Sequence, residues 1–166
     1  MKKIGIFYGS STGTTKSVAE RIGTTLGISK EDVFDVANVS PSKLADYDVL
    51  LLGTSTWGSG ELEDDWYDFI AGVEEMYLKD KTIALFGCGD ENMSDTFCDG
   101  VGILYDRLQK TDAKFIGAFN TEGYEFSNSE AVKNGSAVGL LLDEVNKPSL
   151  SDKRIAEWSE LLKSEF

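Results

Sequence analysis

A run of small hydroxyl residues follows the first apolar segment of the chain. Residues 4–8 form that segment, and a helical pattern of apolar side chains begins at Val18. The residues between them that could contact an anion are Ser10, Ser11, Thr12, Gly13, Thr14 and Thr15. A strand, a tight loop and a helix direct backbone N–H groups and the positive end of a helix dipole at one spot, which favours a phosphate. The same hydroxyls could instead cap the helix at Thr12 or Gly13, although capping needs fewer of them.

This loop matches neither of the common nucleotide-binding motifs. The P-loop pattern fails because Gly9 and Gly13 are too close together and no lysine follows Gly13. The G-x-G-x-x-G pattern fails because Ser10 and Ser11 separate the two glycines. We therefore expect a phosphate site made of hydroxyls and amides, without an adjacent cation.

Composition excludes several classes of function. Of 166 residues, 16 are basic and 29 acidic, and the net charge of -13 disfavours nucleic acid or an anionic membrane as a partner and favours a protein with a basic face. The chain has no histidine, which argues against a zinc site, a Ser-His-Asp triad or a Cys-His pair; Cys88 and Cys98 lie ten residues apart. Residues 1–3 lead straight into the first strand and no long apolar run follows, so we expect a cytoplasmic protein without a leader.

Short apolar runs alternate with amphipathic segments along the chain. Further strands are predicted at 32–36, 49–54, 82–87, 115–119 and 138–142, and helices from about 65, over about 95–110 and from near 151. Ser151 and Asp152 would supply the cap and first-turn charge of the last helix. The alternation predicts one α/β domain, residues 1–166, with a doubly wound parallel sheet covered by helices on both faces. We expect five strands in the order 2-1-3-4-5, which would place the reversal of strand order between the first and third strands. Residues 120–137 are polar and would be an insertion that interrupts the last strand, either for partner contact or without a function.

In such a sheet, ligands bind beyond the carboxyl ends of the strands, where the strand order reverses. The loops predicted there are the hydroxyl loop, a second loop that begins at Thr54 and a third that begins at Gly87. The second loop places Trp57 beside glycines. Its indole could cover the end of the core, but the neighbouring loops favour stacking on a planar, phosphorylated ligand.

These loops together resemble those of the flavodoxins, specifically the long-chain type. Residues 10–15 match the T/S-x-T-G-x-T phosphate loop, and residues 56–62 match the loop that carries the inner tryptophan. Residues 87–90 match the third loop, and Phe97-Cys98-Asp99 continues it into a helix. The 120–137 insertion and the terminal segment from Trp158 are also similar, so the resemblance extends from about Lys3 to the end.

The resemblance implies a low-potential one-electron carrier with non-covalently bound riboflavin 5′-phosphate (FMN), which would cycle between semiquinone and hydroquinone. It also implies a monomer with no substrate turnover of its own. The expected partners are redox proteins with basic faces: reductases of the flavodoxin or ferredoxin type as donors and low-potential enzymes as acceptors.

The resemblance also assigns roles by position. The hydroxyls of Ser10, Thr12 and Thr15 would hold the phosphate, Trp57 would stack on the ring, and Asp90 would approach its pyrimidine end through the backbone. The peptide between Gly58 and Ser59 would flip on reduction, because glycine adopts positive φ at little cost. The whole predicted cofactor-binding set is Ser10, Ser11, Thr12, Gly13, Thr14, Thr15, Thr54, Ser55, Thr56, Trp57, Gly58, Ser59, Gly60, Cys88, Gly89, Asp90, Met93, Phe97 and Cys98.

One departure from the family pattern concerns the outer face of the ring. Many relatives carry a tyrosine in the third loop, whereas this loop is one residue shorter and has Met93 or Ser94 in that region. Met93 could replace the aromatic ring through a softer thioether contact, or it could be an exposed methionine without a ligand.

Three alternative functions would each require a feature that can be checked. An FMN-dependent NAD(P)H:quinone reductase of the same fold would need a nicotinamide or quinone pocket, for which no motif is present. A phosphorylated receiver domain would need an aspartate at the end of the third strand, where Thr54-Ser55 stand. A flavin-free adaptor would purify as a colourless protein.

Overall fold

The computed structural model describes residues 2–57 and 59–166. Five parallel strands form the sheet in the order β2-β1-β3-β5-β6. Their bounds are β1 Ile4–Gly9, β2 Val33–Asp35, β3 Val49–Trp57, β5 Thr82–Cys88 and β6 Lys114–Ile116. The strand order predicted from the sequence is confirmed.

The last position of the sheet is filled by two separate segments. β6 pairs with Thr82–Ala84 of β5, and β9 (Leu140–Leu142) pairs in parallel with the remainder of the same strand, Phe86–Cys88. Between them the chain passes so close to β5 that a Cβ on Gly139 would lie 2.0 Å from the carbonyl oxygen of Leu85. The predicted interruption of the last strand is thus confirmed, and glycine permits the return of the chain.

Two short antiparallel pairs were not predicted. β4 (Glu61–Leu62) folds back on the end of β3, and the hairpin of β7 (Val132–Lys133) and β8 (Ser136–Ala137) lies within the insertion. Two-residue strands are too short to produce a recognisable alternation of apolar and polar side chains.

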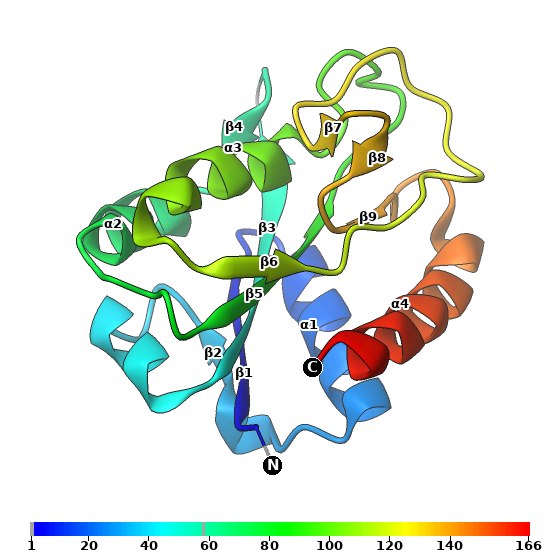
Figure 1. The fold of residues 1–166 in the computed structure, drawn as a ribbon. Coiled ribbons are helices and arrows are strands. Elements are labelled where there is room, and N and C mark those ends of the chain that lie inside the picture. The colour runs from blue at the N-terminus through cyan, green and yellow to red at the C-terminus, as the bar shows by residue number, and fades with distance from the viewer. Residues whose placement is uncertain (1, 58) are drawn as a thin grey trace.

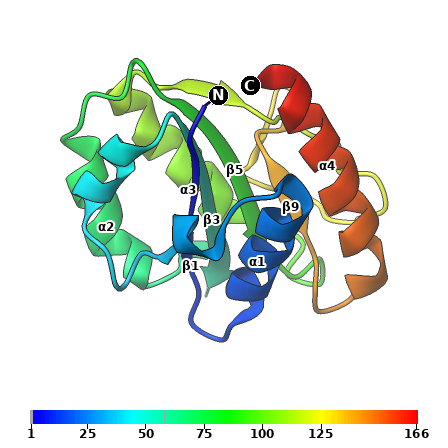
Figure 2. The ribbon, with the colours of Figure 1, turned by 90° about the horizontal axis from the view of Figure 1, so that it is seen from below.

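Four α-helices cover the sheet: α1 Thr14–Leu26, α2 Asp65–Glu74, α3 Asp99–Leu108 and α4 Ser151–Glu165. Figures 1 and 2 show α1 and α4 on one face and α2 and α3 on the other. Each face has its own apolar core, with Phe7, Leu50 and Trp66 on the α2 side and Ile22, Phe86 and Trp158 on the α1 side. The 3₁₀ turns are Lys30–Asp32, Pro41–Asp46, Gln109–Thr111 and Pro148–Leu150.

Two predicted helix starts differ from the structure. α3 begins at Asp99 rather than near Asp95, because Cys98 adopts a left-handed conformation (φ 53°) that a continuous helix does not allow. Ser151 is the first residue of α4 and not its cap, since its hydroxyl donates to Glu144. Asp152 does lie in the first turn, as predicted. No helix within residues 2–57 and 59–166 is long and apolar enough to cross a membrane.

Candidate functional site

The three predicted loops leave neighbouring strands at the same level. Gly9 of β1 is opposite Thr54 of β3, and Thr54 is opposite Gly87 of β5. Since the strands are parallel, their carboxyl ends lie at one edge of the sheet, and the loops that follow meet there. The sheet therefore brings together segments that are about 45 and 35 residues apart in the chain.

The first loop joins β1 directly to α1. Gly13 is left-handed (φ 94°), and its amide N–H donates to Ser10 Oγ at 3.0 Å, so the loop turns sharply into the helix. The first amides of α1 have no carbonyl partner within the helix and carry the positive end of its dipole. Ser11 and Thr12 are exposed, whereas Thr15 is buried. The N-cap residue, Gly13, has no side chain with which to cap α1, and Ser10 is the described hydroxyl of this loop that bonds at the helix start.

Thr15 offers a test of whether the loop fits a phosphate. Its Oγ1 is buried and has no hydrogen-bond partner among the described residues. The thiol of Cys88 faces it, but a thiol is a weak partner for a hydroxyl. An unsatisfied hydroxyl is costly in a folded core, and an oxyanion bound at the helix N-terminus would satisfy it. The loop residues thus fit a phosphate without a lysine or arginine in the loop.

The second loop is a hairpin rather than a free loop. Thr54, Ser55, Thr56 and Trp57 belong to β3, and Trp57 pairs with Glu61 of β4. The indole is 40% exposed, and its Nε1 donates to Ser55 Oγ at 2.9 Å, which orients the ring at the open end of the sheet. Ser59 and Gly60 turn the chain into β4. Gly58 lies outside the described residues, so the predicted flip of the 58–59 peptide stays a prediction.

The third loop begins where β5 ends. The amide N–H of Gly89 donates to the carbonyl of Leu142 in β9 at 2.9 Å, and Asp90 Oδ1 accepts from Asn92 N–H and Asn146 Nδ2. The backbone of Gly89 and Asp90 is therefore fixed at the same edge as Trp57.

Three other predicted site residues of this loop have buried side chains. Cys88, Phe97 and Cys98 belong to the two apolar cores, so they could contact a ligand only through the backbone. Burial raises the pKa of the Cys88 thiol to about 12 and that of Cys98 well above its usual value, so both remain neutral. Neither residue is a nucleophile at neutral pH.

The geometry can hold a flat, phosphorylated molecule, and comparison with known proteins gives the family. A family model described as flavodoxin matches residues 6–158. A flavodoxin of Buchnera aphidicola is 43% identical over 170 residues, covering 100% of this chain and 97% of the relative; a flavodoxin of Nostoc is 42% identical, covering 99% and 98%. The crystal structure of the Fusobacterium nucleatum flavodoxin bound to flavin mononucleotide superimposes with a TM-score of 0.91 at 35% identity, covering 100% of this chain and 99% of that one.

This chain belongs to the flavodoxin family. Flavodoxins are electron-transfer proteins rather than enzymes that turn over a substrate, so the predicted class is confirmed. The flavodoxin fold predicted from the three loops is confirmed as well.

The outer face of the flavodoxin site has one free candidate side chain. Met93 is 52% exposed, so its side chain is accessible at the surface. Ser94 is held away from the open edge: its hydroxyl bonds to Ser127 at 3.0 Å, and its carbonyl accepts two amide N–H groups, from Ser127 and Asn128. Of the two alternatives, only Met93 is free to cover a ligand.

The insertion of this flavodoxin packs along the third loop. Phe126 stacks on Phe97 with ring centroids 4.8 Å apart, and Ser129 donates its hydroxyl to the Phe97 carbonyl. The amide N–H of Glu130 donates to Asp99 Oδ1 at 2.8 Å. Figure 1 shows the two segments side by side above the sheet. The insertion therefore helps to hold the third loop in place, a role that neither sequence alternative included.

Two buried carboxyls at the site were missed from the sequence. Asp99 begins α3, and burial raises its pKa; a Cβ on Gly60 would lie 2.6 Å from its Oδ2. Glu63, between β4 and α2, is fully buried and accepts a hydrogen bond from Ser11 of the first loop. Glu63 stands beside the exposed acidic residues Glu61 and Asp64, so nothing local distinguishes it, whereas the apolar neighbours of Asp99 were the one local signal of its burial. No cluster that could hold a metal ion occurs in the described part of the chain.

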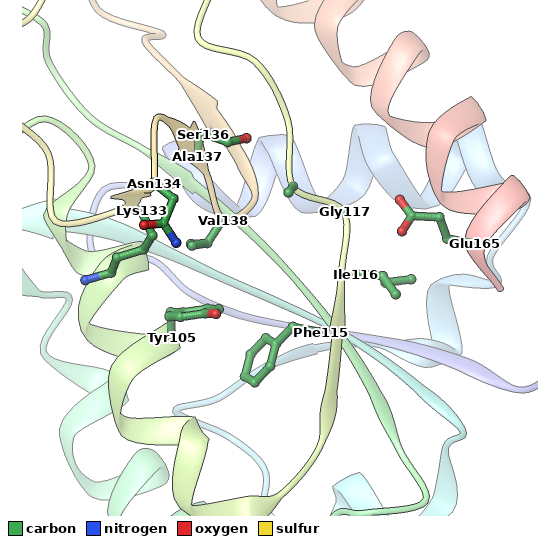
Figure 3. A pocket seen from close by; sticks show the side chains of 11 residues that line it. Tyr105, Phe115, Ile116, Gly117, Lys133, Asn134, Ser136, Ala137, Val138 and Glu165 are labelled. Atoms are coloured by element: carbon green, nitrogen blue, oxygen red, sulfur yellow. The ribbon is translucent and has the colours of Figure 1, made fainter.

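A separate hollow of about 390 Å³ lies at the edge of the sheet beside β6. Figure 3 shows it between Tyr105 of α3, Phe115 of β6 and the side chains of the β7–β8 hairpin, with Lys133 and Glu165 at its margins. None of the residues of the three loops lines it, so it is distinct from the flavodoxin site.

Proposed function

We propose that the three loops bind FMN and that the protein carries single electrons at low potential between redox partner proteins. The observation that carries this proposal is the meeting of three features at one sheet edge. These are the buried hydroxyl of Thr15 without a partner, the half-exposed Trp57 and the fixed backbone of Gly89 and Asp90. FMN, when bound, supplies reversible one-electron chemistry.

The phosphate would be held by the first loop. Ser10, Thr12 and Thr15 contribute hydroxyls, and the amides at the start of α1 contribute donors aligned with the helix dipole. The ribityl chain would pass the strand residues Thr54 and Thr56. Because no cation stands in the loop, binding relies on oriented dipoles and on exclusion of water.

The ring would lie between Trp57 and the third loop. Stacking on an electron-rich indole favours a neutral ring over one that has gained negative charge. Asp90 and Glu91 are half-buried on the third loop, and Asp64 is exposed and Asp65 half-buried at the start of α2. Like charge close to the ring makes each added electron less favourable, which lowers the potential.

The acidic surface provides the proposed contact with partners. A net charge of -13 attracts proteins with basic faces and accelerates their approach at low ionic strength. The proposed partners are flavodoxin or ferredoxin reductase-type donors and low-potential acceptor enzymes, met by a monomer. The cytoplasmic location expected from the sequence stays a prediction.

The proposal is tested by adding FMN to the cofactor-free protein. Trp57 fluorescence should fall as FMN binds, and Trp57→Leu should weaken binding and remove most of the quenching. The other two tryptophans, Trp66 and Trp158, are fully buried, and the Trp57→Leu protein gives their share of the fluorescence change. Absence of binding at excess FMN would refute the proposal.

The electron-carrier part needs a second measurement. Stepwise chemical reduction should give two separate one-electron changes in the absorption spectrum, and NADPH alone should give none. Rapid bleaching by NADPH without a partner protein would favour a quinone reductase instead.

A further inference from the structure

A buried carboxyl lies directly beneath the proposed phosphate loop. Glu63 Oε1 accepts from the Ser11 hydroxyl at 3.2 Å and from the Asp65 amide N–H at 2.9 Å. Its other oxygen adjoins the end of β1, since a Cβ on Gly9 would lie 2.7 Å from Oε2. The side chain is fully buried, although the residue follows an exposed turn. Glu63 therefore contacts the strand end and the loop that would hold the phosphate.

The groups that face Glu63 include no cation. From α2 its carboxyl group faces the Asp65 carboxylate, and from the first loop the neutral Ser11 hydroxyl. The Trp66 ring of α2 adjoins the same point of β1 as Glu63 Oε2, and the Thr54 hydroxyl of β3 accepts only from the backbone amide of Glu63, at 3.4 Å. Within the described residues, no lysine or arginine forms a salt bridge with it. Burial, opposed by the Asp65 amide and reinforced by the Asp65 carboxylate, raises the pKa of Glu63 to about 7. Both protonation states are therefore accessible near neutral pH.

The two states place different hydrogen bonds next to the phosphate. An ionised Glu63 only accepts, so it holds the Ser11 hydroxyl proton and adds a negative charge beside the anion. A protonated Glu63 can donate its own proton to Ser11 Oγ, which frees the Ser11 hydroxyl proton for a phosphate oxygen. A phosphate monoester carries nearly two negative charges above its second pKa of about 6. Repulsion between the phosphate and a carboxylate buried beside it favours the protonated carboxyl when phosphate is bound, since no salt bridge to Glu63 occurs within the described residues.

We propose that Glu63 is a proton-linked positioning residue of the phosphate loop: it takes up a proton when the FMN phosphate binds and so makes the affinity fall as the pH rises. This inference rests on the proposed binding of FMN. One proton enters from solvent and resides on the Glu63 carboxyl, and no covalent bond changes. Linkage then lowers the affinity by up to tenfold for each pH unit above neutrality.

The experiment is a titration of the cofactor-free protein with FMN between pH 7 and 9, followed by the quenching of FMN fluorescence. The wild-type Kd should rise about tenfold from pH 7 to pH 8.5. In Glu63→Gln, which keeps the acceptor oxygen but does not ionise, Kd should change less than twofold. Glu61→Gln is the matched control because it removes an exposed carboxylate from the same hairpin; it should follow the wild type.

Binding of riboflavin shows whether the pH dependence comes from the phosphate or from the ring. Riboflavin lacks the phosphate, so its Kd should show no such dependence in any of the three proteins. Calorimetry at pH 7.5 in two buffers of different ionisation enthalpy should give an uptake of up to about 0.7 proton for wild-type binding of FMN, because about a quarter of the carboxyls are already protonated at that pH. This measurement needs no variant and therefore holds even if Glu63→Gln fails to fold.

The possible results are distinct. Three results would each overturn the role of Glu63 while leaving FMN binding intact. The first is an equal pH dependence of FMN binding in wild type and Glu63→Gln, and the second is the same dependence with riboflavin. The third is the absence of proton uptake by the wild type. No FMN binding at any pH would overturn the proposed function itself, and this inference with it.

Discussion

The buried carboxyl of Glu63 should make the cofactor-free protein less stable as the pH rises, and Glu63→Gln should remove that loss. The raised pKa means that the folded state prefers the protonated carboxyl. The contribution of Glu63 to the free energy of unfolding is therefore fully present below its pKa in the unfolded state, 4.5, and is lost as the pH rises through its pKa in the folded state, about 7.

The size of the effect follows from the same shift. Moving the pKa from 4.5 to about 7 corresponds to at most about 3.5 kcal/mol, since one pKa unit is worth about 1.4 kcal/mol. Part of that loss has already occurred by pH 5. The stability of Glu63→Gln relative to wild type should accordingly increase by about 2 kcal/mol between pH 5 and pH 8.5. Glutamine retains an oxygen for the Ser11 hydroxyl and the Asp65 amide, so the hydrogen bonds of the start of α2 are kept.

Urea unfolding of the FMN-free proteins at pH 5, 7 and 8.5 measures this difference. The free energy of unfolding should fall with urea concentration at the same slope in both proteins, so that a shift in the midpoint reports a change in stability. Glu61→Gln, on the exposed side of the hairpin, should differ from wild type by less than about 0.5 kcal/mol at each pH. If the free energies of unfolding of wild type and Glu63→Gln differ by the same amount from pH 5 to pH 8.5, the carboxyl does not titrate in this range and the reasoning is wrong.

Three further changes test other parts of the site and fold. Met93→Tyr offers a flat ring to the outer face of the cofactor and should tighten FMN binding by about 0.5–1.5 kcal/mol, measured as Kd; unchanged affinity would place residue 93 away from the ring. Phe126→Ala removes the stacking on Phe97, so the amide hydrogens of the third loop should exchange with solvent faster and FMN binding should weaken. Unchanged hydrogen exchange would show that the insertion does not hold the loop in place. Arg107 and Lys110 lower the pKa of Glu74 to about 2, so Glu74→Gln should cost about 1–2 kcal/mol at neutral pH after solvent screening. That cost should disappear as the pH falls from 4.5 through 2, and a constant difference in acid unfolding would contradict the ion-pair explanation.

Much of the fold could be predicted because its signals are local. Residues 49–53 of β3 and most of β5 have no polar side chain, as expected for strands covered on both faces, and the alternation of strands with helices indicates that these strands are parallel. The errors occur at helix ends. Cys98 adopts a left-handed conformation and Ser151 bonds to Glu144 in the preceding loop, and neither is announced by a pattern of apolar and polar side chains.

The sequence by itself determined the hydroxyl loop, the position of Trp57 after a buried strand and the strands themselves, because each is set by residue type and by periodicity within one short segment. Only the tertiary structure decided which carboxylates are buried. Glu63 meets Ser11 from 52 positions away, and Asp99 meets Glu130 from 31. Burial of a charge depends on what the rest of the chain packs around it, and identical carboxylates a residue or two away, Glu61 and Asp64, remain in solvent.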